Sequence, residues 1–377
     1  MIYLDNSATT KPCASAVENI NKCLTDNWGN PSSLYSFGID AETEVNLARA
    51  AVADMLNCRE DEIFFLSGGT EANNLALTGT AEAKRRTGKR IVTTSIEHPS
   101  VLNTLQNLES KGFEVIRVKP EKDGNIDYNK FISQINDDTI LVSMMLVNNE
   151  TGCIFPVGRV AQYIHDSKLN AVIHCDAVQA FGKMPIDIES LNIDLLSASG
   201  HKIHASKGIG FLYKSRKLNI KPIIFGGNQE SGLRSGTESV PLISGLRGAI
   251  AELRVKETLQ SVKELHDYAV AEFSKTGIVK INSPEHCHLP FVLYVSIPGY
   301  RSENMLHYLE AKGICVSSGS ACSKGRGSHV LNEMGLDRKT VDSALRISFS
   351  RYNKRSDIDE LCAAITEIPQ KLRKSKF

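Results

Sequence analysis

Short apolar runs alternate with helical patterns along the first part of the chain. The runs predict buried strands at 63–66, 90–94, 113–118, 139–147, 171–175, 193–198 and 208–213. Helices are expected between them, at about 70–84, from Pro99 onward, and near 127–136 and 157–168. Such alternation is typical of a mostly parallel sheet with helices on both faces, an α/β fold. The run at 208–213 is interpreted as an antiparallel edge strand of a mixed sheet.

The pattern changes after Pro241. A long amphipathic segment runs to about Ser274, and later segments predict strands at 291–297 and 345–349 and helices near 302–312 and 356–374. We therefore expect a large domain at 14–250. Residues 1–13 and 251–377 are expected to form a smaller α+β domain, which carries a cysteine-bearing loop.

Composition narrows the class of protein. A chain of 377 residues is too long for one simple core, and 41% hydrophobic with 23% charged residues is ordinary for a globular enzyme. With a formal net charge of +1, the protein has no strong positive field that would attract nucleic acid. The first residues lack the features of a signal peptide, and no apolar run approaches the roughly 18 residues that span a bilayer. We expect a cytoplasmic protein that contacts neither nucleic acid nor membrane.

Nine cysteines occur and none forms a Cys-x-x-Cys pair, so most are expected to be reduced, buried side chains, and no resident metal is predicted. Cys322 differs because it lies in a segment with five serines and three glycines, 317–328. Lys324 and Arg326 would favour its thiolate, which makes it a candidate nucleophile on a mobile loop. The rival, Cys315, stands in an apolar run that predicts a buried strand.

Asp176 and Lys202 form the first chemical signal. Asp176 ends an apolar strand and Lys202 follows 26 residues later. Pyridoxal phosphate needs such a pair, because a lysine amine bonds to its aldehyde and a carboxylate keeps its pyridine nitrogen protonated. With 44 lysines and arginines in the chain, the pair carries little weight alone.

Polar residues at other strand ends have two interpretations each. The Ser-Gly-Gly-Thr-Glu turn at 67–71 suits a phosphate or an ordinary helix N-cap. His98 would lie at the carboxyl edge of the sheet, where its imidazole could stack on a ring or shuttle a proton as a catalytic residue, or could be a loop histidine bonded to the backbone. Asn148 and Gln179 are candidates for a ring oxygen, and Asn148 also for a substrate carboxylate, although Asn before Gly also makes a plain turn.

Two arginine-containing segments follow. Arg346 interrupts a strand pattern, where it would either pair with a core carboxylate or grip an amino-acid carboxylate. The Arg-Ser-Gly-Thr loop at 234–237 is polar and has the character of a phosphate contact.

Together these residues resemble the NifS/IscS-type cysteine desulfurases, class V of the pyridoxal-phosphate-dependent aminotransferases. The resemblance covers almost the whole chain, through 3–10, 29–32, 67–71, 97–98, 147–152, 176–179, 199–202, 234–237, 317–322 and Arg346. It implies the type I fold of pyridoxal-phosphate transferases: a mostly parallel, mixed central sheet with helices on both faces, plus a smaller α+β domain.

The resemblance also implies roles for individual residues. Lys202 would carry the cofactor, Asp176 would pair with the pyridine nitrogen, and His98 would stack on the ring. Ring-oxygen contacts would come from Asn148 and Gln179. The phosphate would be held by Gly69, Thr70, Ser199 and His201, with Thr237 from the other subunit of a homodimer. Arg346, helped by Asn148, would bind the substrate carboxylate.

Cys322 would attack the sulfur of L-cysteine and become a persulfide, leaving alanine. The sulfur would pass to an acceptor protein, an iron–sulfur scaffold or a tRNA-thiolation enzyme, and Cys322 could transiently ligate a cluster with that partner. Only seven residues, 323–329, separate Cys322 from Val330, which is slightly shorter than in relatives with the longest loops. The chain ends 31 residues after Arg346, without the tail that some relatives use to dock an iron–sulfur scaffold. Both departures leave the identity of the sulfur acceptor undetermined. His204-Ala205-Ser206 is a further small departure from the family pattern.

Other functions of the same fold remain at this point. A selenocysteine lyase would use the same residues, whereas a true aminotransferase would not need Cys322. A non-enzymatic scaffold would tolerate the loss of Lys202 or Asp176, and both are present.

Overall fold

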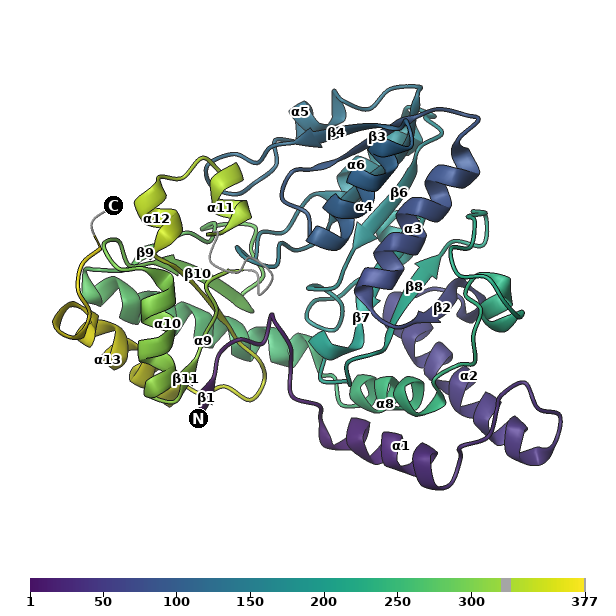
Figure 1. The fold of residues 1–377 in the computed structure, drawn as a ribbon, viewed down its shortest axis with the longest axis horizontal. Helices are drawn as coiled ribbons and strands as arrows, with labels where there is room; N and C mark the ends of the chain where they lie inside the picture. Colours follow the sequence, from purple (N-terminus) through teal and green to yellow (C-terminus); the bar gives the residue numbers. More distant parts are fainter. Residues whose placement is uncertain (320–326, 376–377) are drawn as a thin grey trace.

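The computed structural model describes residues 1–319 and 327–375, which divide into two lobes (Figure 1). The larger lobe is built on a seven-stranded sheet of order β2-β8-β7-β6-β5-β3-β4. The strands are β2 (Ile63–Leu66), β3 (Arg90–Thr94), β4 (Glu114–Val118), β5 (Thr139–Met145), β6 (Val172–Asp176), β7 (Leu195–Ser199) and β8 (Gly210–Lys214). Every pairing is parallel except the two that β8 makes, so the carboxyl ends of the other strands share one edge.

The position of β8 corrects one expectation. The antiparallel direction was predicted, but β8 is not an edge strand, because it lies between β7 and β2 and β2 forms that edge. The register pairs Ile63 with Tyr213 and Leu66 with Gly210, residues far apart in the sequence. An apolar run indicates that a strand is buried, but it does not indicate which strand lies beside it in the sheet.

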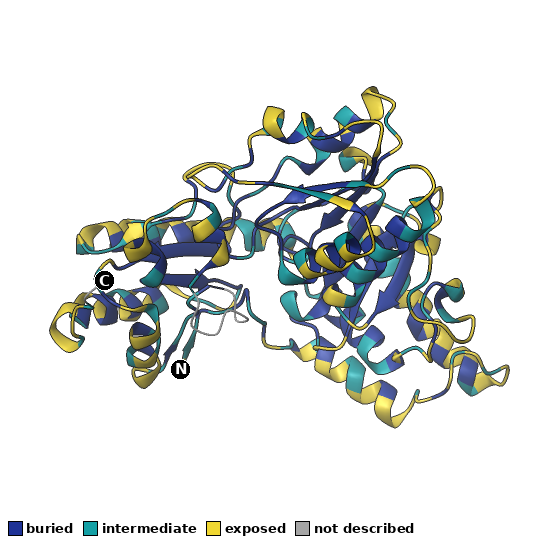
Figure 2. Ribbon diagram, turned by 45° about the horizontal axis from the view of Figure 1, so that its top comes forward, coloured by how far each residue is buried: buried dark blue, intermediate teal, exposed yellow. Residues whose placement is uncertain are grey.

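Helices cover both faces of this sheet, because successive strand side chains point to opposite faces. Phe64 and Leu66 join a core with α3 (Gly69–Lys84) and α4 (Pro99–Ser110). Ile63 and Phe65 belong to the core of the opposite face, to which α1 (Ala14–Thr25), α2 (Ser36–Leu56), α6 (Val157–Asp166) and α8 (Val240–Ala251) contribute along with other helices. The strands are buried and the outer helix surfaces exposed (Figure 2). No helix in the described part of the chain is long and apolar enough to cross a bilayer.

The smaller lobe has its own antiparallel sheet, in which β10 (Val292–Ser296) lies between β12 (Ala344–Ser348) and β9 (Lys280–Ile281). Its helices are α9 (Val255–Thr276), α10 (Ser302–Ala311), α11 (His329–Glu333), α12 (Arg338–Asp342) and α13 (Arg355–Lys371). One long amphipathic segment was expected after Pro241. The structure forms two helices there: α8 packs on α1 and α2, and α9 packs on α13. We propose that the domain boundary falls between α8 and α9.

The large lobe also contains two short helices, α5 (Tyr128–Ile132) and α7 (Ile188–Leu191).

The N-terminal segment joins the lobes. β1 (Ile2–Tyr3) pairs in parallel with β11 (Ile314–Cys315) of the smaller lobe, and Asp5 bridges to Ser348. The chain then passes between the lobes to α1 (Figure 1). β11 is only two residues long, and Cys315 is half-buried rather than buried as expected, because β11 gains only this one partner strand. Of the cysteines in the described part of the chain, four are buried, at positions 13, 23, 153 and 175.

Candidate active site

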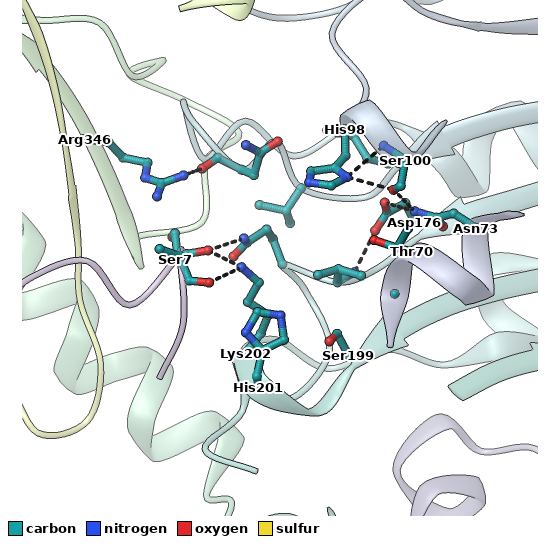
Figure 3. A pocket seen from close by; sticks show the side chains of 17 residues that line it. Ser7, Thr70, Asn73, His98, Ser100, Asp176, Ser199, His201, Lys202 and Arg346 are labelled. Carbon is teal, nitrogen blue, oxygen red and sulfur yellow. Dashed lines mark hydrogen bonds between the residues drawn. The ribbon is translucent and has the colours of Figure 1, made fainter. Parts of the chain in front are cut away.

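A cavity of about 250 Å³ opens at the carboxyl edge of the large sheet, beside the N-terminal segment and β12. Ligands of open α/β sheets bind at this edge. Nine of the residues predicted from the sequence line it: Gly69, Thr70, His98, Asp176, Gln179, Ser199, His201, Lys202 and Arg346. Most of them point toward one another in the close view (Figure 3). Of the remaining three predicted residues, Asn148 and Thr237 do not line the cavity, and Cys322 lies outside the described residues.

Asp176 is held rigidly at the end of β6. Its Oδ2 accepts a hydrogen bond from Asn73 Nδ2 at 2.7 Å, and its Oδ1 accepts from the Val178 amide at 3.0 Å. A buried carboxylate oriented in this way can make a charge-assisted bond to a protonated ring nitrogen. Asn73 was missed by sequence reasoning. The available signal was an amide side chain inside the apolar pattern of α3, because a buried polar group needs a partner.

Lys202 enters the cavity directly after β7, from the short 3₁₀ turn Gly200–Lys202. Its Nζ donates to the carbonyl oxygens of Ser7 and Ala8, at 2.5 and 2.8 Å. Gln179 Nε2 donates to the same Ser7 oxygen at 3.0 Å. The N-terminal segment therefore positions the lysine amine and the Gln179 amide together, a role for Ser7 and Ala8 that the sequence did not suggest.

His98 is the N-cap of α4 and its ring is oriented by the helix. Nδ1 accepts a hydrogen bond from the Ser100 amide at 3.1 Å, which leaves the ring proton on Nε2. Burial lowers the pKa of His98, while the neighbouring Asp176 raises it in part. A neutral, flat ring facing the cavity is suited to stacking on an aromatic ligand.

One side of the cavity suits a phosphate. Gly69 and Thr70 begin α3, whose first amides have no intrahelical partners, and Ser199 lies beside them. A Cβ atom at Gly69 would stand 2.6 Å from Val178 Cγ2, so only glycine lets the helix start this close to the Asp176 turn. Burial lowers the pKa of His201 to about 4, so its ring is neutral and can donate one hydrogen bond.

These observations test the site against pyridoxal phosphate. The cavity contains a lysine amine, one carboxylate held by two donors, a neutral ring and a helix N-terminus. This donor set fits the aldehyde, the pyridine nitrogen, the ring face and the phosphate of that cofactor.

The assignment of Asn148 to the ring oxygen and the substrate is wrong. Asn148 is fully buried, and its Oδ1 accepts from the amides of Glu150 and Thr151 at 2.9 and 3.0 Å. Its Nδ2 donates to Ile96 O at 3.1 Å. Both polar atoms of the Asn148 side chain are thus used within the protein, Oδ1 to close the turn and Nδ2 to hold Ile96, and the next residue, Asn149, lines the cavity instead. Two adjacent asparagines cannot be told apart by sequence, because the local backbone decides which one points inward.

Arg346 pairs with a core carboxylate, one of its two predicted roles, and it also lines the cavity. It is 2% exposed, and its Nη2 forms a salt bridge with Asp5 Oδ1 at 2.9 Å. Its Nη1 donates to the carbonyl oxygen of Asn149 at 2.9 Å. Burial raises the pKa of Asp5, and the adjacent Arg346 lowers it in part. The guanidinium is thus fixed by one carboxylate and still lines the cavity.

Thr237 lies away from this cavity. It is exposed and lines a separate hollow with Ser67 and Arg234. Arg234 Nε pairs with Glu71 Oε1 at 2.9 Å, which ties the 234–237 loop to the first turn of α3. Within one chain, Thr237 does not reach the residues suited to the phosphate.

Comparison with known proteins gives consistent matches. The Aminotransferase class-V family model matches residues 2–361. "Cysteine desulfurase IscS" of Methanosarcina thermophila is 40% identical over 376 residues, covering 99% of this chain and 93% of that protein. "Putative cysteine desulfurase IscS 1" of Bacillus subtilis is 39% identical over 379 residues, covering 98% of this chain and 99% of the relative.

Solved structures agree with the sequence matches. A "NIFS-LIKE PROTEIN" superposes with a TM-score of 0.93 at 36% identity, covering 98% of this chain and all of the other. "SspA in complex with cysteine" gives a TM-score of 0.84 at 31% identity, covering 94% of this chain and 100% of that one. The chain belongs to the class V aminotransferases and, within them, to the NifS/IscS-type cysteine desulfurases. The predicted family, fold class and pyridoxal-phosphate cofactor are confirmed.

Proposed function

We propose that this chain removes the sulfur of L-cysteine, releases L-alanine, and receives the sulfur on Cys322 as a persulfide. The observation that carries the proposal is the meeting of Lys202, Asp176 and Arg346 around one cavity. Relatives named cysteine desulfurases, and a similar structure described in complex with cysteine, support the same substrate.

Each cavity residue has a distinct part in binding the cofactor. Lys202 would bond to the aldehyde, Asp176 would hold the ring nitrogen protonated, and His98 would stack on the ring. Gly69, Thr70, Ser199 and His201 would hold the phosphate, and Gln179 would face the ring oxygen. When bound, pyridoxal phosphate supplies an electron sink for the bonds broken at the substrate carbon.

Arg346 would bind the substrate carboxylate. Its guanidinium is already oriented by Asp5 and by the Asn149 carbonyl, so little side-chain freedom is lost when the carboxylate arrives. Lys202 would carry the proton between the substrate α-carbon and the cavity, because its amine is the basic group next to that position. The C–S bond of cysteine breaks while a bond forms between that sulfur and the Cys322 thiolate, and a proton goes to the β-carbon.

The site would be completed by a second copy of the chain. In this proposal the partner subunit's Thr237 contacts the phosphate, and the distance of Thr237 from its own cavity supports that arrangement. The persulfide would pass to an acceptor protein, for iron–sulfur assembly or thiolation of tRNA or a cofactor. We place this chemistry in the cytoplasm, where thiols stay reduced.

The test uses the purified holoenzyme and L-cysteine. We expect equal amounts of alanine and sulfide with a reductant, and one persulfide per subunit on Cys322 without it. Cys322→Ser should keep the cofactor absorbance and release almost no sulfide, whereas Cys287→Ser, at an exposed cysteine, should behave as wild type. Persulfide mainly on Cys315, or full sulfide release by Cys322→Ser, would overturn the proposal. Amino-group transfer retained in Cys322→Ser would indicate an aminotransferase.

A further inference from the structure

A buried carboxylate stands next to the site and has no part in the function proposed above. Glu150 follows Asn149 directly and is 2% exposed. Its Oε2 accepts a hydrogen bond from Ser328 Oγ at 2.5 Å. Burial raises the pKa of Glu150, while the bond from Ser328 and the nearby Arg346 lower it. A carboxyl group is costly to bury, so the partners that stabilise it here are specific contacts.

The Ser328 contact lies at the start of α11, just after residues 320–326. Ser328 is the N-cap of this helix, and its Oγ accepts from the Leu331 amide at 3.0 Å while it donates to Glu150. His329 adds a second tie, since its Nε2 lies 2.8 Å from the Ser95 carbonyl oxygen. Glu150 therefore holds the N-cap residue of α11.

On the preceding side, Gly319 packs beside the same carboxylate. Ser317 pairs with Arg346 through backbone bonds of 3.1 and 2.6 Å, and its Oγ donates to the Gly319 carbonyl at 2.9 Å. A Cβ atom at Gly319 would stand 2.9 Å from Tyr294 Oη and 3.2 Å from Glu150 Oε2. Gly319 also has φ +125°, so glycine is required here for both space and conformation.

We infer that Glu150 is a positioning residue: it holds Ser328 by a hydrogen bond and packs beside Gly319, so it fixes residues on either side of 320–326 next to the Arg346 site. The link is continuous, because Arg346 Nη1 donates to the carbonyl of Asn149, the residue before Glu150. The inference rests on the proposed function only in assigning sulfur transfer to Cys322.

The experiment compares Glu150→Ala, Glu150→Gln and Ser328→Ala with wild-type holoenzyme. One readout is kcat for alanine formation from L-cysteine. A second is the affinity for L-alanine, followed by cofactor absorbance, which needs the Arg346 site but no transfer to Cys322. A third is the rate of Cys322 alkylation by iodoacetamide, with the exposed Cys287 as the internal standard.

If Glu150 positions the segment, kcat falls by about 10- to 100-fold in Glu150→Ala, because a small misplacement of a reacting group has this effect. Affinity for L-alanine stays within about twofold, since the Arg346 contacts remain. Glu150→Gln, which keeps an acceptor for Ser328, should recover part of kcat. Ser328→Ala should lower kcat in the same direction, and the Cys322 alkylation rate relative to Cys287 should change in both alanine variants.

Gly319→Ala provides a further test, with Gly335→Ala as its matched control. Both glycines have positive φ, but a Cβ atom at Gly335 meets nothing within 4 Å. Only Gly319→Ala should lower kcat. Equal kcat in wild type and Ser328→Ala, or alanine affinity falling as far as kcat, would overturn the inference. If wild type forms no alanine from L-cysteine, the proposed function fails, and the relative alkylation rates still decide whether Glu150 anchors the segment.

Discussion

The cavity has two sides of different construction. Its floor, Asp176, Lys202 and His98, stands at or just after the carboxyl ends of β6, β7 and β3. Its wall, Ser7, Asn149 and Arg346, comes from three separate segments. The wall depends on contacts such as Arg346 to Asp5, residues 341 positions apart in the sequence.

This difference separates cofactor binding from substrate binding. The floor is rigid because one sheet with both faces buried holds its strand ends together. The wall is positioned by a few polar bonds across the lobes, so a change there should affect substrate and sulfur transfer before it affects the cofactor. The following predictions test that separation.

The largest effect is expected for Lys202→Ala on the floor. Loss of the covalent attachment should lower activity by roughly three or more orders of magnitude. Borohydride reduction of wild type followed by peptide mass analysis should place the pyridoxyl group on Lys202, and the variant should yield none. Lys207→Ala, at an exposed lysine, is the control and should be normal. A pyridoxyl group on Lys207 would show that the floor is misassigned.

Asp176→Asn should lower kcat by about 100-fold, because a charge-stabilising partner of this kind contributes a few kcal/mol. The variant should still bind pyridoxal phosphate, measured by absorbance after dialysis. Asn73→Ala, which removes the 2.7 Å bond to Asp176 together with a 2.9 Å bond to Ser100 Oγ, should have a smaller effect in the same direction. Near-normal turnover of Asp176→Asn would contradict the role of Asp176 in stabilising the protonated ring nitrogen.

Arg346→Lys on the wall should raise KM for L-cysteine by roughly 10- to 100-fold, since lysine cannot make the two-pronged contact. Cofactor affinity should stay close to that of wild type. Arg351→Lys, which alters an arginine paired with Glu252, serves as the control for general disturbance. If cofactor affinity falls as much as KM rises, the two sides are not separate.

The smallest effect concerns Glu97, buried beneath the floor next to His98. Its carboxylate accepts from the Met145 amide at 3.0 Å, and burial raises its pKa from 4.5 to about 8. Between these two values the folded protein holds a proton that the unfolded chain has released. The contribution of Glu97 to the free energy of unfolding therefore falls as pH rises toward about 8.

Glu97→Gln removes this titration, so stability should depend less on pH than in wild type. Urea unfolding of the holoenzymes at pH 6 and pH 8 measures the difference, with Glu360→Gln at an exposed site as the control. An unchanged pH dependence in Glu97→Gln would show that the buried carboxyl is ionised throughout this range.

Much of the floor could be predicted because its residues are tied to strand ends. Asp176 ends an apolar run, and Lys202 and His98 follow such runs closely, so local pattern places them at one edge. Arg346 was also found, as a charge inside a strand. The positions that failed depend on neighbours that the pattern does not encode: Asn148 instead of Asn149, and β8 as an edge strand.

The sequence by itself determined the α/β class, the seven strands of the large sheet in their order along the chain, and the chemical types gathered at the carboxyl edge. It did so because periodicity and strand-end position are local properties of the chain. Only the tertiary structure decided that Ser7 orients Lys202, that Asn149 faces the cavity, and that Glu150 meets Ser328, 178 residues away. Those contacts arise when packing of the two lobes brings distant backbone and side-chain atoms within hydrogen-bond range, a condition that no local pattern records.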